Sequence, residues 1–186
     1  MKNILKESIL VKEKLLKSDA ETIAQIAQLI VDAAKNGNKL IVFGNGGSAA
    51  DSQHMAAELI GRFKHERAPI PAIALSTNTS TITALSNDYG YEVSFSRQLE
   101  GLAKKGDVAL GISTSGNASN VYEALKKAKA LGLKIVTMTG ETGGKIAGLA
   151  DIALKVPSSN TPRIQEAHIT ASHIICELVE EELLGK

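Results

Sequence analysis

The chain has 186 residues, 44% of them hydrophobic and 22% charged, a size and composition typical of one globular domain with a sizeable core. Its 21 basic and 20 acidic residues nearly cancel, so no excess charge attracts nucleic acid or an anionic lipid surface. The single Cys176 cannot form an internal disulfide and no apolar run reaches the roughly 18 residues of a membrane span, so we expect a cytoplasmic protein with neither nucleic acid nor a membrane as partner.

Two stretches with apolar residues at helical spacing begin the chain and predict two leading helices, over residues 4–17 and 21–37. Short, continuously apolar runs then alternate with helical patterns, as expected for strands covered by helices on both faces. This order predicts an α/β fold: a doubly wound five-stranded parallel sheet flanked by helices, with the N-terminal helices before it and a long C-terminal helix after it, in a single domain over residues 1–186. The expected strands are residues 39–44, 71–76, 107–113, 133–140 and 151–157, and the further helices are residues 48–62, 79–85, 92–104, 118–131, 144–149 and 161–184.

Ligands of such a sheet bind at the carboxyl ends of its strands, where the first loop reads "FGNGGSAAD". Its glycines match the dinucleotide pattern G-x-G-x-x-A, but the acidic residue that should follow the second strand is replaced by Ser, Thr and Asn at residues 76–78. A tight strand-to-helix turn is one alternative. The interpretation we favour is close approach of the backbone and an amide to a polar ligand, through Asn45, Gly46 and Gly47.

The second loop, "GISTSGNASN" at residues 111–120, again joins a strand to a helix. It has the glycine spacing of a nucleotide P-loop, but Asn117 and Ala118 stand where lysine and a hydroxyl residue should be, which disfavours a nucleoside triphosphate. Free N–H groups at a helix start suit a phosphate monoester, although a row of hydroxyls is also ordinary helix capping. The hydroxyl residues are Ser113, Thr114 and Ser115.

The third loop, "ALSNDYG", carries Asn87 and Asp88 before Gly90. Taken alone this is common turn chemistry, so it indicates little about function.

Histidine, glutamate and glutamine side chains recur on two expected helices. His54 and Glu58 are four residues apart and therefore share one helix face. Gln165 and His173 are eight apart, about two turns, so they can face one site as well. These four residues could bind a divalent metal such as zinc, or Glu58 and His173 could act as general base and acid without a metal.

The other two histidines receive structural interpretations. His168 points farther round its helix than Gln165 and His173, so we expect it in packing or at a subunit contact. His65 lies in the charged stretch "RFKHER" and is expected at the surface.

Four stretches in order, "GNGGSAADSQHMAAEL", "SNDYG", "GISTSGN" and "RIQEAHITASH", resemble the sugar isomerase (SIS) domain family, specifically its phosphoheptose isomerases. The resemblance spans nearly the whole chain. It implies an aldose–ketose isomerase that converts sedoheptulose 7-phosphate to D-glycero-D-manno-heptose 7-phosphate, the first step toward nucleotide-activated heptose for lipopolysaccharide, capsule or related glycans. It also implies a homotetramer with active sites between protomers.

The resemblance further implies roles for individual residues. Family members often carry Ser where this chain has Ala118, and the neighbouring Ser119 could supply the hydroxyl for the last phosphate contact. Glu58 and His173 match the catalytic acid/base pair, and His54, Glu58, Gln165 and His173 match the ligands of one zinc ion per subunit. Contacts to the sugar are implied for Asn45, Gly46, Gly47, Glu58, Asn87, Asp88 and Gln165, and contacts to the phosphate for Ser113, Thr114 and Ser115.

Two other functions compete with this one. A non-catalytic SIS domain that binds a partner protein, like the replication-initiator-associating relatives, or that senses a sugar phosphate, would need neither Glu58 nor His173, and both are present. An isomerase of another phosphorylated ketose would need the same residues, and pocket depth cannot be read from one sequence.

Overall fold

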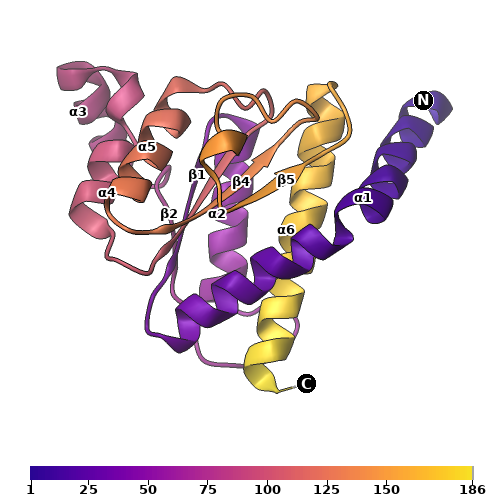
Figure 1. Ribbon diagram of the computed structural model, residues 1–186, viewed down its shortest axis with the longest axis horizontal. Helices are drawn as coiled ribbons and strands as arrows, with labels where there is room; N and C mark the ends of the chain where they lie inside the picture. The colour runs from indigo at the N-terminus through magenta and orange to yellow at the C-terminus, as the bar shows by residue number, and fades with distance from the viewer. Residues whose placement is uncertain (186) are drawn as a thin grey trace.

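The computed structural model describes residues 1–185, which form one five-stranded sheet with helices on both sides (Figure 1). The strand order is β2-β1-β3-β4-β5 and all neighbours run parallel, so the expected doubly wound α/β fold is confirmed. Each strand lies within its predicted range. The strands are β1 (Leu40–Gly44), β2 (Ala72–Ala74), β3 (Val108–Ser113), β4 (Lys134–Thr139) and β5 (Ile152–Lys155).

The helices follow the predicted order with three differences described below. They are α1 (Lys2–Lys35), α2 (Gly47–Ile60), α3 (Thr79–Tyr89), α4 (Ser96–Leu102), α5 (Ser119–Ala130) and α6 (Thr161–Leu184), with 3-10 turns η1 (Tyr91–Val93) and η2 (Ala147–Leu149).

The prediction of two leading helices is wrong, because α1 is a single helix of 34 residues. Residues 2–35 contain neither glycine nor proline, so nothing in the backbone breaks the helix between the two apolar stretches. The hydroxyl of Ser18, at the expected junction, donates to the carbonyl of Lys14 one turn earlier, an arrangement that is compatible with a continuous helix.

Two later helices are shorter than predicted. The expected helix 92–104 is divided into η1 and α4. The expected helix 144–149 is only the turn η2, because Gly143 and Gly144 adopt positive φ angles of 75° and 52°, outside the α-helical region.

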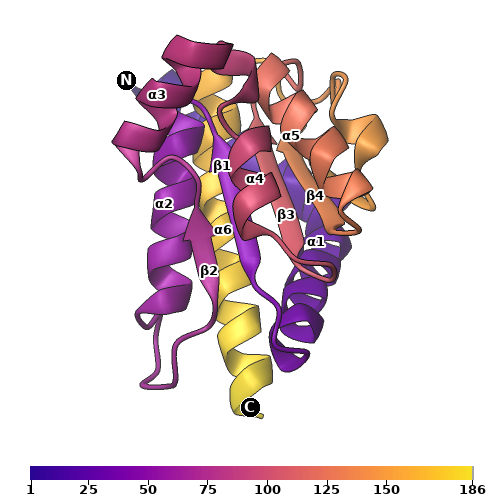
Figure 2. The same cartoon turned by 90° about the vertical axis from the view of Figure 1, so that its left-hand side faces the viewer.

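The sheet separates two apolar cores. Figures 1 and 2 show α1, α2 and α6 on one face and α4 and α5 on the other. In β1, Leu40 and Val42 belong to the core beneath α1, α2 and α6, and Ile41 and Phe43 to the core beneath α4 and α5. This alternation explains why the strand is apolar at every position. Within residues 1–185, no helix is long and apolar enough to span a bilayer.

Candidate active site

Helices α2 and α6 lie side by side and run in the same direction, which brings their functional residues into register. Near the start of both helices, the side-chain amide of Gln165 lies against Gly47. A Cβ added at residue 47 would lie only 2.4 Å from Nε2 of Gln165. Two turns on, His54 Nε2 is 3.1 Å from His173 Nε2. Beyond the end of α2, the backbone N–H of Lys64 donates to Glu180 at 2.7 Å.

His54, Glu58 and His173 form one cluster between these helices. His54 Nε2 lies 3.0 Å from Glu58 Oε1, and one donor atom from each of the three residues lies within 4.8 Å of the others. His54 is exposed and the other two are half-buried, so the cluster is open to ligands on one side. The ring of Phe63 packs against His173 with centroids 5.7 Å apart. Two imidazoles and a carboxylate are ordinary zinc donors, and their spacing could hold one ion.

Gln165 is placed differently from the other three predicted metal ligands. It precedes His173 by about 12 Å of helix rise and lies against the glycine loop after β1. The structure thus brings together His54, Glu58 and His173, while a place for Gln165 among the zinc ligands stays a prediction.

A cavity of about 210 Å³ lies next to Gln165, at the carboxyl ends of β1 and β3. The glycines of the first loop make it possible, since a Cβ at Gly44 would lie 2.8 Å from the carbonyl oxygen of Ile112 and Gly46 has a φ of 56°. The opposite wall is the hydroxyl row of the second loop. The lining residues are Asn45, Ser48, Ile112, Ser113, Thr114, Ser115, Ala118 and Gln165.

The start of α5 is not capped by the hydroxyl row. The residue before the helix is Ala118, which makes no side-chain cap. Within residues 1–185, the first-turn N–H that has a side-chain acceptor is that of Val121, which donates to Asn120 Oδ1 at 3.0 Å. Ser115 Oγ instead accepts from the backbone N–H of Asn117, outside the helix. The backbone N–H groups of Ser119 and Asn120 therefore remain available to an anion, as phosphate binding requires.

Asn45 is held by two residues that sequence analysis did not identify. Its Oδ1 accepts from the hydroxyl of Tyr91 at 2.7 Å and from Asn120 Nδ2 at 2.9 Å, and its own Nδ2 donates to Asn120 Oδ1 at 2.8 Å. Asn120 is buried in the first turn of α5, at the end of the second loop motif. A buried polar residue on an otherwise apolar helix face was the signal that could have identified it.

Asn87 and Asp88 lie in the last two turns of α3 and are exposed. Asn87 Nδ2 donates to Asp88 Oδ1 at 2.8 Å, and neither residue lines the cavity within the described part of this chain. Their predicted contact with the sugar stays a prediction.

Asp51, which sequence analysis also missed, lies one turn before His54 on α2. Burial raises the pKa of its carboxyl to about 6, against the opposing charge of His54. Its Oδ2 is buried without a hydrogen-bond partner in residues 1–185. A carboxyl that titrates near neutrality therefore lies close to the cluster.

The remaining histidines are structural. His168 is fully buried and its Nε2 lies 3.1 Å from the carbonyl oxygen of Thr139, which confirms its expected role in packing. Burial lowers its pKa to about 4, so the ring is neutral. His65 is half-buried rather than fully at the surface, and its backbone N–H donates to Glu180.

Comparison with known proteins agrees with this architecture. Residues 5–140 match the SIS domain family, and the chain belongs to that family. The similar proteins include phosphoheptose isomerases. That of Aquifex aeolicus is 56% identical over 97% of this chain and 95% of its own length. The structure of phosphoheptose isomerase from Neisseria gonorrhoeae has a TM-score of 0.92 at 42% identity, covering 96% of each chain. That of the enzyme from Francisella tularensis has a TM-score of 0.94 at 36% identity, covering 97% of this chain and 96% of its own.

Proposed function

We propose that the chain is an aldose–ketose isomerase that converts sedoheptulose 7-phosphate to D-glycero-D-manno-heptose 7-phosphate, the first step toward nucleotide-activated heptose. The observation that carries this proposal is the convergence of Glu58 and His173 from separate helices, His54 Nε2 lying 3.0 Å from the carboxylate and 3.1 Å from the second imidazole. The similarity to phosphoheptose isomerases over nearly the whole chain supports it.

The two side chains suit the chemistry of a ketose–aldose exchange. The reaction moves a proton between C1 and C2 through an enediol, so a carboxylate has to reach those carbons while a second group exchanges protons with the oxygens. Glu58 takes the carbon proton and returns it to the neighbouring carbon, and His173 serves the oxygens. Each positioned acid or base contributes about 10²- to 10⁴-fold to such a reaction.

The cluster also fits zinc, one ion per subunit. His54, Glu58 and His173 would hold it, with Gln165 as the fourth ligand that the family resemblance implies. When bound, zinc supplies a positive charge that polarises the sugar carbonyl. The fit rests on donor atoms that lie within 4.8 Å of one another and are the imidazole and carboxylate types that zinc prefers.

The cavity beside Gln165 suits the other end of the substrate. The hydroxyls of residues 113–115 and the free N–H groups of Ser119 and Asn120 provide hydrogen-bond donors for a phosphate group, and none of these donors carries a formal positive charge. The adjoining loop, from Asn45 to Gly47, faces the hydroxyls of the sugar. Binding the inert phosphate end orients the reacting end over Glu58 and His173.

We further infer that the enzyme works as a homotetramer in the cytoplasm. The first half of α1 exposes large apolar side chains, with Ile4, Leu5, Ile9 and Leu10 each more than half exposed and Leu16 71% exposed. Between α1 and α6 an apolar groove of about 220 Å³ contains Leu16 and Ile174. A second copy of the chain is the occupant we propose, because the apolar side chains exposed on α1 continue into this groove and form a surface suited to contact between protomers.

The decisive experiment is an assay of the purified protein on a panel of phosphorylated ketoses, with Glu58→Gln as the inactive variant. We expect turnover of sedoheptulose 7-phosphate and its loss, by at least about 100-fold, in the folded variant. A higher kcat/KM on a shorter ketose phosphate would assign another substrate. Absence of turnover on every member would favour a non-catalytic SIS domain.

A further inference from the structure

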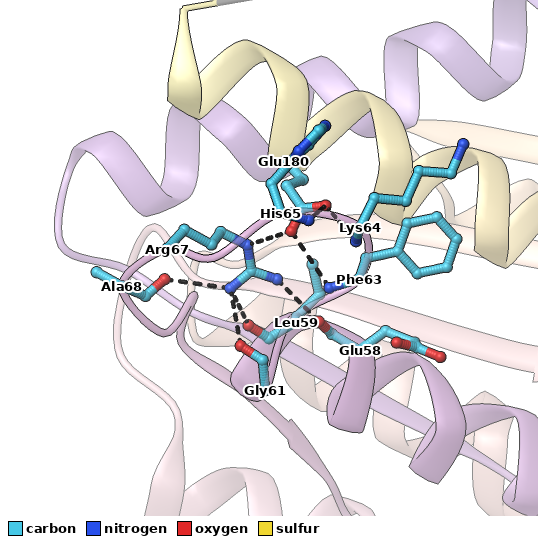
Figure 3. A network of polar contacts seen from close by, with 9 residues as sticks. All are labelled: Glu58, Leu59, Gly61, Phe63, Lys64, His65, Arg67, Ala68 and Glu180. Carbon is cyan, nitrogen blue, oxygen red and sulfur yellow. Dashed lines mark hydrogen bonds and ion pairs between the residues drawn. The ribbon is translucent and has the colours of Figure 1, made fainter.

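A buried ion pair joins α6 to the segment that follows α2 (Figure 3). Arg67 Nε lies 3.0 Å from Glu180 Oε1, and the side chains are 4% and 1% exposed. A buried pair of this kind gains stability only when further hydrogen bonds satisfy both charges.

The carboxylate of Glu180 is fully satisfied. It accepts from the backbone N–H groups of Phe63 at 3.2 Å, Lys64 at 2.7 Å and His65 at 3.1 Å, in addition to Arg67. Burial by itself would raise the pKa of this carboxyl, but the three backbone hydrogen bonds and the charge of Arg67 lower it below its usual value. Glu180 is therefore an anion that fastens the loop after α2 to α6.

The guanidinium of Arg67 binds the carboxyl end of α2. Its Nη2 donates to the carbonyl of Glu58 at 2.8 Å, and its Nη1 donates to that of Leu59 at 2.8 Å and more weakly to that of Gly61 at 3.3 Å. The last carbonyls of a helix have no partners within the helix, and a cation there also complements the helix dipole. Arg67 thus fixes the backbone of Glu58 itself.

The same network reaches His173 by two routes. Glu180 follows His173 by seven residues, about two turns, so both lie on the α6 face that meets α2. Phe63, whose N–H donates to Glu180, packs its ring against that of His173. The ion pair between Arg67 and Glu180 therefore connects the backbone of Glu58 with the helix that carries His173. Through the N–H of Phe63, it also connects to the aromatic ring beside that imidazole.

We propose that Arg67 and Glu180 are positioning residues, whose ion pair sets the separation of Glu58 from His173 and thereby the geometry of the cluster. The consequence for turnover rests on the proposed function, whereas the consequence for zinc binding does not. A purely structural ion pair would affect the stability of the protein but leave kcat and zinc affinity of the folded protein unchanged.

The test compares Glu180→Gln and Arg67→Lys with a matched control. Gln removes the charge of Glu180 at nearly constant shape, and Lys keeps the charge of Arg67 but not the planar fork that reaches two carbonyls. The control is Glu177→Gln, which breaks the exposed pair between Lys64 and Glu177, a link between the same loop and the same helix.

For both variants we expect kcat and zinc affinity, measured by competition with a chelator, to fall about 10- to 100-fold, as for other residues that orient metal ligands. We expect KM to change less than about threefold, because the phosphate cavity lies at the other end of α2. The control should match the wild type in all three quantities.

Wild-type kcat and zinc affinity in the folded variants would overturn the proposal. If either variant fails to fold, Glu180→Asp replaces it, since it keeps the charge but withdraws the carboxylate by one methylene. If all three variants fail to fold while the control Glu177→Gln folds, the ion pair serves the stability of the protein. This outcome would also overturn the proposal. A wild-type protein inactive on every ketose would reject the proposed function, while zinc affinity would still decide the role of Arg67 and Glu180.

Discussion

The cluster on α2 and α6 and the cavity at the start of α5 are built in different ways. The cluster consists of side chains on two long helices, held in register by Gln165 against Gly47 at one end and by Glu180 against the α2–β2 segment at the other. The cavity lies between two loops at strand ends, where glycines permit close approach and the N–H groups of Ser119 and Asn120 have no side-chain cap. The difference suggests that acid–base chemistry at the cluster depends on side chains that packing holds in place. Ligand binding in the cavity depends instead on the conformation of the loops.

The largest expected effects are on kcat for a substitution in the cluster and on KM for a substitution in the cavity. His173→Asn should lower kcat by at least about 100-fold with little change in KM, because it removes a proton-transfer group. Thr114→Ala should raise KM up to about tenfold with little change in kcat, because it removes one hydrogen bond to a charged phosphate. Steady-state kinetics on sedoheptulose 7-phosphate measures both. Equal losses of kcat in the two variants would contradict the division of roles.

The backbone conformation of the loop between β3 and α5 can be tested at Gly116. Its φ is 67°, and a Cβ would lie 2.2 Å from the carbonyl oxygen of Gly143. We expect Gly116→Ala to lower the free energy of unfolding by more than about 2 kcal/mol, since both strain and a backbone clash oppose it. Gly148→Ala is the control, because nothing lies within 4 Å of its Cβ position. Urea unfolding measures the difference, and equal stability of the two variants would refute the expectation.

A smaller effect concerns the stability contributed by the buried His168 on α6. The pKa of His168 is about 4 in the folded chain against an ordinary value of 6.5, so below pH 6.5 the unfolded state binds a proton that the folded state does not. This histidine should therefore destabilise the protein by about 2 kcal/mol between pH 7 and pH 5.

Asp51 opposes this trend, because its raised pKa of about 6 makes the folded state bind a proton in the same window. The pH dependence of the unfolding free energy should therefore be compared between wild type and His168→Gln. The variant should lose less stability on acidification, and an unchanged dependence would mean that His168 is not the group responsible.

The smallest expected effect concerns the reactivity of the thiol of Cys176, which lies on α6 between His173 and Glu180. Burial raises the pKa of its thiol to about 12, with the charge of Glu58 adding to the shift. We expect no reaction with a thiol reagent at pH 8 until the protein unfolds. Rapid labelling of the native protein would show that α2 and α6 separate readily, contrary to a fixed cluster.

Much of the architecture could be predicted from local sequence, because each strand is a short apolar run and each main helix has a recognisable period. The continuity of α1 was missed, since apolar spacing locates helices but the absence of a breaker decides whether two of them join. The turn η2 was missed for the opposite reason, because glycines with positive φ interrupt a helical pattern. The single domain over residues 1–186 stays a prediction.

The candidate site was less accessible to sequence reasoning than the fold. His54 and Glu58 could be paired because four residues of one helix fix their geometry. Tyr91 and Asn120 could not be linked to Asn45, since the contacts join residues 46 and 75 positions apart. Arg67 and Glu180 were missed because a charge in a polar loop and one on a helix resemble solvated surface residues until burial is known.

The sequence by itself determined the alternation of strands and helices, the glycine and hydroxyl loops at strand ends, and the residue types available for acid–base chemistry or metal binding. Only the tertiary structure decided which of them meet: it brought His173 to His54 across 119 positions and left Asn87 and Asp88 outside the cavity of their own chain. The physical reason is that hydrophobic periodicity and turn chemistry act over a few residues, whereas the convergence of side chains depends on how α2 and α6 pack on the shared sheet.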